Sequence, residues 1–275
     1  MEKEFKPEPG GSKLAYFPRA GWIRHIDPWW ALVLVVVLLV VLLVTLQADP
    51  FSNILRFVRD GIRITVTVSI SAFLIVLVLG LIGGLGRISK NPFIRFPASL
   101  YIEVVRGVPL LVQLIWWYFA FPVVIHQIGE GLNIAALTEF RANPIVMAIL
   151  GLAICYGAYM SEIYRAGIQS IPKGQMEASR SLGMSYFQSM RHIVLPQAIR
   201  VILPPVGNEA IALLKDSSLV SVVAVADLTR RGREFMAVNF NPIEVWTMVA
   251  LLYLVMTLLL SRLVSWIEKR SQFER

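Results

Sequence analysis

Long runs of apolar residues dominate the pattern along the chain. A helix needs about 20 mostly apolar residues to cross a bilayer, because the hydrocarbon core is about 30 Å thick and a helix rises about 1.5 Å per residue. Three runs meet this test, at 29–46, 64–86 and 245–261. Three weaker candidates contain Pro, Gly or charge, at 102–125, 144–159 and 199–226. The pattern predicts an all-α polytopic membrane protein with about six transmembrane helices.

Lysine and arginine are unevenly divided between the segments that connect these spans. Segments on one side hold 17 of them (1–28, 87–97, 161–200 and 262–275), and segments on the other side hold 7 (47–63, 126–143 and 227–241). The positive-inside rule therefore predicts that both termini are cytoplasmic. The apolar run 29–46 is longer than the core of a signal peptide and follows a 28-residue polar head, which favours a retained helix over a cleaved signal.

Composition excludes several other classes of protein. Hydrophobic residues make up 56% of the chain, and the net charge of +8 is spread between apolar runs, so no basic face for nucleic acid forms. Cys155 is the only cysteine and the histidines are far apart, so no metal site is predicted. A Gly-x4-Gly-Lys-Ser/Thr phosphate loop is absent. We therefore expect this chain to bind no cofactor.

The predicted cytoplasmic loop 161–200 contains the segment EASRSLGMSYFQSMRHIVLP at 177–196. Residues 175–182 have helix-forming composition up to Gly183, a plausible C-terminal stop. Ser185 and Gln188 have capping-box spacing and predict a second helix that ends near Pro196. That helix places Phe187, Met190, Ile193 and Val194 on one side. The segment is expected to form a compact cytoplasmic knob.

The spacing of this knob resembles the EAA loop of binding-protein-dependent ABC importer permeases. The residues that carry the resemblance are Glu177, Ala178, Gly183, Ile193, Leu195 and Pro196, with Ser179 where the family has a second alanine. The resemblance implies that the loop docks into a cleft of a separate ATPase subunit, which holds ATP and Mg. Without it, the segment could also be an amphipathic loop on the lipid surface or a solvated connector.

Three further segments are similar to the polar amino acid branch of that family, which imports histidine, glutamine, glutamate, arginine and related solutes. They read VRGVPLLVQL (105–114), YRAGIQSIPKGQMEAS (164–179) and LLKDSSLVSVVAVADLT (213–229). The resemblance covers about 61–267, with 29–46 as an extra N-terminal transmembrane helix and 1–28 as a cytoplasmic tail.

What the resemblance implies is a type I importer in the bacterial cytoplasmic (inner) membrane, working by alternating access. Its other parts are two ATPase subunits, a second permease chain, identical or paralogous, and an extracytoplasmic solute-binding protein. The solute would be an amino acid.

Charged side chains in or near the spans suggest the solute path, because intramembrane charge is costly and tends to face the bundle interior. An amino acid zwitterion needs a cation for its carboxylate and an acceptor for its ammonium. Arg106 and Glu162 are the predicted pair, with Gln113 and Asn208 as polar lining. Alternatively, Arg106 reaches the headgroups and Glu162 pairs with Arg165 as a brace. Other charges in these segments are Glu209, Lys215 and Asp216.

Two other functional classes fit the sequence less well. An ion-coupled secondary transporter of amino acids usually shows an internal repeat, and we see none. A membrane-embedded enzyme lacks the usual Ser/His or Cys/His clusters. Gly80 and Gly84 form a small-residue pair in the second span, which predicts close packing against another helix or another subunit.

Overall fold

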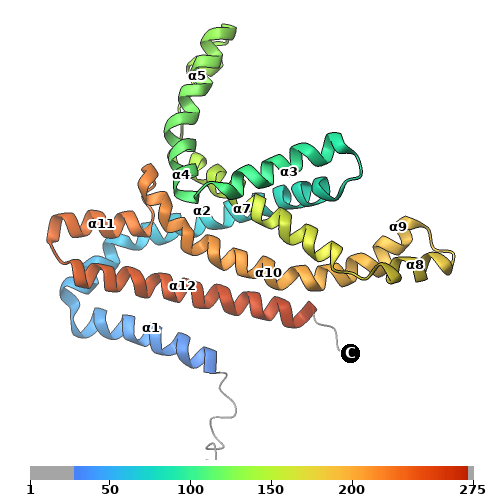
Figure 1. The fold of residues 1–275 in the computed structure, drawn as a ribbon. Helices are drawn as coiled ribbons and strands as arrows, with labels where there is room; N and C mark the ends of the chain where they lie inside the picture. The colour runs from blue at the N-terminus through green and yellow to red at the C-terminus, as the bar shows by residue number, and fades with distance from the viewer. Residues whose placement is uncertain (1–27, 272–275) are drawn as a thin grey trace, which may run out of the picture.

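A computed structural model describes residues 28–271, so the predicted tail 1–28 lies outside the described residues except for Pro28. Every regular element in this range is helical (Figure 1), which confirms the all-α class. The longer elements are α1 (Pro28–Leu46), α2 (Ala48–Ile88), α3 (Pro92–Gly107), α7 (Pro144–Gln169), α10 (Leu195–Asp216), α11 (Leu228–Asn239) and α12 (Pro242–Ser271). The shorter ones are α4 (Leu110–Ile115), η2 (Trp116–Ala120), α5 (Phe121–Leu132), α6 (Ala135–Thr138), α8 (Lys173–Ser181), α9 (Tyr186–Ser189), η3 (Met190–Val194) and η4 (Ser217–Val223).

Within 28–271, five segments are long and apolar enough to cross a membrane. They are Trp29–Leu46, Ala48–Ile88, Leu110–Leu132, Pro144–Gln169 and Pro242–Arg270. The predicted span 199–226 corresponds to α10 and η4, and α10 packs between α7 and α12 in the bundle. It does not reach the same hydropathy because Arg200, Asn208, Glu209 and two prolines interrupt its apolar residues. The count of six and the side of the termini stay predictions.

The predicted span 102–125 is wrong as one continuous helix. α3 ends at Gly107, and α4 begins at Leu110 in a different direction (Figure 1). Val108 between them has extended backbone angles, φ −108° and ψ 133°. Pro109 explains the break, because a proline ring disfavours helical geometry at the residue before it. The chain therefore turns sharply before α4, η2 and α5.

The close packing predicted for Gly80 and Gly84 is confirmed between α2 and α7. A Cβ on Gly80 would lie 2.4 Å from a side-chain carbon of Met160, and one on Gly84 would lie 2.8 Å from the carbonyl oxygen of Ser161. Both distances are shorter than carbon side chains tolerate. The adjoining core includes Val76, Leu152 and other buried residues of α2, α7, α10 and η4.

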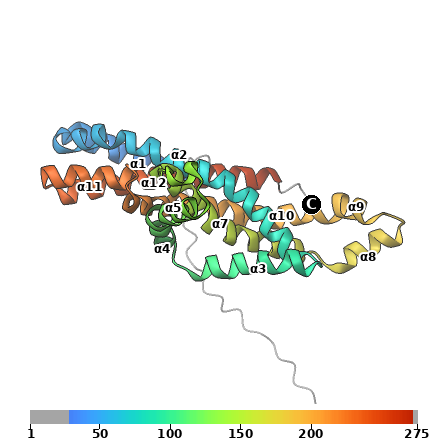
Figure 2. The same cartoon turned by 90° about the horizontal axis from the view of Figure 1, so that it is seen from above.

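The helix α1 lies along the outside of the bundle. Its buried side chains Val33 and Val36 pack against Leu258 of α12, while most of its other large apolar side chains are exposed. The Trp30 ring lies 5.4 Å from the guanidinium carbon of Arg262. Figures 1 and 2 show α1 beside α12 in both views. The residues that follow α1 join a second core cluster with α11 and α12.

Candidate functional site

The predicted knob is present at one end of the bundle, where α8 and α9 project together (Figures 1 and 2). α8 ends as predicted at Gly183, which has a left-handed φ of +84°. The amide of Gly183 donates to the carbonyl of Arg180 at 3.0 Å, and the amide of Met184 donates to the carbonyl of Ser179 at 3.2 Å. These two bonds form a Schellman motif, which satisfies the last carbonyls of a helix and favours glycine.

The second helix of the knob begins as predicted with a capping box. The Ser185 hydroxyl accepts from the amide of Gln188 at 3.3 Å, and the Gln188 side chain accepts from the amide of Ser185 at 2.8 Å. The predicted end near Pro196 is wrong, because α9 continues through η3 into α10. Pro196 cannot donate to the preceding turn, and the wide π turn η3 absorbs that misfit just before it.

The six motif positions and Ser179 lie at different depths in the knob. Glu177 and Ala178 are exposed on α8, Ile193 is half-buried, and Leu195 and Pro196 are exposed. Ser179 is buried, and its hydroxyl donates to the carbonyl of Met176 at 2.8 Å. A small side chain therefore fits where the family has alanine, and its polar group is satisfied within its own helix.

The tip of the knob exposes large apolar side chains. Leu182 is 84% exposed, Tyr186 64% and Phe187 71%. The predicted apolar side of the second helix is covered unevenly: Phe187 is exposed, Met190 and Ile193 are half-buried, and Val194 is buried. Ser189 is buried as well. Apolar residues exposed together at the end of a projecting loop are typical of a surface that another protein covers.

Glu162 lies in an ion-pair network that joins three helices. Its carboxylate accepts from Arg165 at 3.0 Å through Nε and from Arg87 at 3.2 Å, and Arg87 also pairs with Glu103 of α3 at 2.7 Å. Both oxygens of Glu162 are therefore engaged by arginines of the same chain. This geometry favours the brace over a solute ligand for Glu162.

Gln113 is buried where α3 ends and α4 begins. Its side-chain amide donates to the carbonyls of Val105 and Val108, each at 2.8 Å. The break before Pro109 removes these carbonyls from a regular helix, so the amide replaces the missing donors. Gln113 therefore holds the turn between α3 and α4, and its predicted place in the solute path stays a prediction.

Arg106 lies near acidic groups from two other helices. Its guanidinium carbon is 5.2 Å from the ring centroid of Tyr159, and its charge acts on the carboxyls of Glu162 and Glu209. Within the part of the chain that the structure describes, half-buried Glu209 forms no hydrogen bond or salt bridge, and exposed Asn208 adjoins it. The structure thus brings a cation, an aromatic face and an unpaired carboxyl into one region.

Tyr156 and Tyr159 were missed by sequence reasoning. The Tyr156 hydroxyl donates to Asp216 of α10 at 2.7 Å, across 60 residues of sequence. Tyr156, Tyr159 and Glu162 recur every three residues along α7, so they share one helix face. That spacing is the signal that could have identified this polar face.

Asp227 holds the start of α11 and was also missed. Its carboxylate accepts from the amides of Thr229 at 3.1 Å and Arg230 at 3.0 Å and from the Tyr253 hydroxyl at 3.2 Å. The side chain is fully buried, and burial raises the pKa of this carboxyl above its usual value. Asp227 thus caps α11 and joins it to Tyr253 of α12, and the pKa of its carboxyl lies above its usual value.

The knob and the bundle together define a membrane permease of the importer class. The family model described as "Binding-protein-dependent transport system inner membrane component" matches residues 76–272. The chain belongs to this family and is a permease subunit of an ATP-binding-cassette importer.

Individual relatives agree with that assignment. The chain is 38% identical over 211 residues to the glutamine transport system permease protein GlnP of Escherichia coli (strain K12), covering 77% of this chain and 91% of the relative. It is 37% identical to the L-cystine transport system permease protein TcyB of Bacillus subtilis (strain 168), over 76% of this chain and 84% of the relative. A crystal structure of an amino acid ABC transporter with histidines superposes with a TM-score of 0.70 at 38% identity, covering 82% of this chain and 97% of that one.

Proposed function

We propose that this permease carries a polar or charged amino acid across a bacterial cytoplasmic membrane. The relatives just described are named for glutamine and L-cystine, and the matching solved structure is an amino acid transporter. The chemistry of the bundle is consistent with such a solute, because Arg106 offers a cation for a carboxylate and Glu209 an acceptor for an ammonium group. Glu209 takes the acceptor role here in place of Glu162, whose oxygens are occupied.

The observation that supports ATP-driven transport is the projecting knob with its exposed apolar tip. A permease of this family has to receive energy from a partner, and the sequence contains no phosphate loop of its own. Leu182, Tyr186 and Phe187 supply an apolar contact surface, and Glu177 on α8 of the same knob is exposed to solvent, where it can meet a basic group. We infer that ATPase subunits, which bind ATP and Mg, dock on this surface.

A second permease chain is supported by the segment Leu110–Leu132, here called the arm. The arm projects away from the bundle (Figure 1). Only 11% of its most apolar 18-residue stretch is buried, whereas 61% of the corresponding stretch of α7 is buried. Its exposed side chains include Trp116, Phe119 and Val123. An apolar arm that packs on so little of its own chain is suited to contact an identical or paralogous chain.

An uptake experiment tests the proposal. The chain is reconstituted in proteoliposomes with its ATPase and an extracytoplasmic solute-binding protein, and uptake of labelled amino acids is followed. We expect uptake to require ATP on the side of the membrane where the ATPase is bound. We also expect it to require the solute-binding protein on the opposite side. Uptake that proceeds without the ATPase and follows an ion gradient would instead establish the secondary-transporter alternative.

The solute path has its own test. Arg106→Gln and Glu209→Gln should raise the solute concentration needed for half-maximal uptake while leaving docking of the ATPase intact. The matched variant Glu162→Gln should lower the amount of folded protein, since it breaks the ion-pair network. Equal uptake by wild type and both path variants would contradict the assignment of the path.

A further inference from the structure

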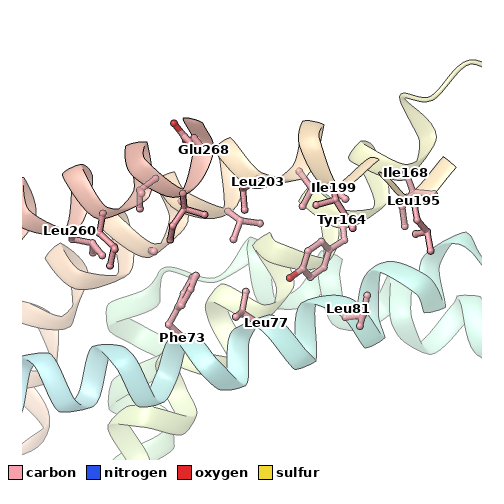
Figure 3. A pocket seen from close by; sticks show the side chains of 17 residues that line it. Phe73, Leu77, Leu81, Tyr164, Ile168, Leu195, Ile199, Leu203, Leu260 and Glu268 are labelled. Atoms are coloured by element: carbon pink, nitrogen blue, oxygen red, sulfur yellow. The ribbon is translucent and has the colours of Figure 1, made fainter. Parts of the chain in front are cut away.

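An apolar groove lies between α2, α7, α10 and α12 (Figure 3). Its volume is about 640 Å³, with Phe73, Leu77 and Leu81 of α2 along one wall and Leu203 and Leu260 on the opposite side. A second apolar cavity of about 310 Å³ continues the groove past Phe73 and Leu260. Glu268, the one acidic residue among the described residues of the lining, stands at the rim with its carboxylate directed away from the other labelled side chains (Figure 3). The groove is therefore suited to a hydrocarbon chain.

The end of the groove nearest the knob opens into a larger, partly polar chamber. The chamber has a volume of about 1040 Å³ and shares Ile168 and Leu195 with the groove. Lys90, which follows α2, and Lys173, the first residue of α8, both line it. Both lysines are exposed, and neither forms a salt bridge within the described range 28–271. Among the described residues the lining contains no aspartate or glutamate, so this part of the chamber carries uncompensated positive charge.

We propose that the groove and the chamber together bind one anionic phospholipid. The acyl chain lies in the groove and the phosphate headgroup lies between Lys90 and Lys173. From Phe73 to Leu85, α2 lines this path over twelve residues, about 18 Å of helix. That length is comparable to half of the roughly 30 Å hydrocarbon core, so the chamber sits at the depth of the headgroups of one leaflet.

The charge pattern selects the lipid class. Basic residues at the membrane surface attract anionic headgroups, whereas a zwitterionic headgroup leaves the two lysines without net compensation. A protein partner would have to bury both lysines and the apolar groove at once, and would need acidic groups placed beside an apolar ridge. A phospholipid supplies this combination of an anion and an apolar chain in a single molecule.

The site has a mechanical consequence for the permease. The chamber is also lined by Met176 of α8, Tyr186 of α9 and Met190 of η3. A lipid bound there contacts the end of α2 and both halves of the knob, which are α8 and the helix formed by α9 and η3. The lipid would therefore fill a space beneath the surface that we assign to the ATPase.

Native mass spectrometry of the full-length chain, purified with its partner subunits in a mild detergent, tests the site. Phosphatidylglycerol, phosphatidylcholine with the same acyl chains, and glycerol 3-phosphate are titrated separately. We expect retention of phosphatidylglycerol, weaker retention of phosphatidylcholine and no binding of glycerol 3-phosphate. Lys90→Gln and Lys173→Gln should each weaken phosphatidylglycerol binding about five-fold.

Two further variants separate the groove from general surface charge. Ala210 lines both apolar cavities, so Ala210→Phe should fill the groove and reduce binding of both phospholipids. Exposed Lys269 lines neither cavity, so Lys269→Gln should leave binding unchanged. Equal binding of the two phospholipids, or wild-type affinity in the double lysine variant, would overturn the proposal. Tight binding of glycerol 3-phosphate would make this a free phosphate site, and loss of phosphatidylglycerol on dimerisation would show that a second copy covers the groove.

Discussion

The bend at Gly183 should decide whether the knob transmits energy. A residue with a Cβ pays roughly 1–2 kcal/mol for left-handed backbone angles, and a branched side chain pays more. Because about 1.4 kcal/mol is a tenfold change in an equilibrium, Gly183→Ala should lower the population of correctly bent loops about 5- to 30-fold. Asparagine tolerates these angles, so uptake per inserted molecule should fall in the order Gly, Asn, Ala, Val.

The space around Gly183 makes this a clean test of backbone strain. Within residues 28–271, no atom outside its chain neighbours lies within 4 Å of a Cβ built at Gly183, so the substitutions create no clash there. Gly174 in α8 has the same open surroundings without a left-handed φ, which makes Gly174→Val the matched control. The assay is ATP-driven uptake normalised to the amount of permease in the membrane. Equal uptake by Gly183→Val and Gly183→Asn would refute the reasoning.

Three other variants test separate contacts. Glu177→Lys should reduce copurification of the ATPase, with Glu139→Lys, an exposed glutamate outside both the knob and the arm, as control, and unchanged stoichiometry in a pull-down would count against docking at Glu177. Gln113→Leu removes the side-chain donor of the Val108 carbonyl and leaves the Val105 carbonyl with only the Val108 amide at 3.4 Å. An unsatisfied buried group costs about 1–3 kcal/mol, so the melting temperature should fall, and an unaltered melting curve would disprove the positioning role of Gln113. Because the folded pKa of Asp227 lies above its usual 3.8, the unfolding free energy should decrease as pH rises from 3.8 through that raised value. Asp227→Asn should remove this slope, and a slope that persists in the variant would assign it to other groups.

Local rules predicted the knob well because its geometry depends on neighbours in sequence. Gly183 and the Ser185–Gln188 capping box each form bonds within five residues. Pro196 misled the prediction because a π turn, which has no sequence signature here, lets the helix continue. The orientation of Phe187 also depends on which face of the second helix packs on the bundle.

The candidate solute path was only partly predictable for a different reason. Arg106 and Glu209 are 103 positions apart, and their proximity depends on how α3 and α10 pack around α7. Charge within apolar segments identified both residues as candidates. The choice of Glu162 as the acceptor failed to anticipate Arg87, which reaches it from α2 across 75 residues.

Because α9, η3 and α10 follow one another without a gap, the second helix of the knob and Glu209 lie on one continuous helix. Phe187 and Glu209 are 22 residues apart, about 33 Å along the axis. A tilt of about 10° around one end would carry the other end by about 6 Å over that length. A small rotation imposed by a partner at the exposed tip would therefore arrive at the carboxyl as a displacement larger than the width of a water molecule.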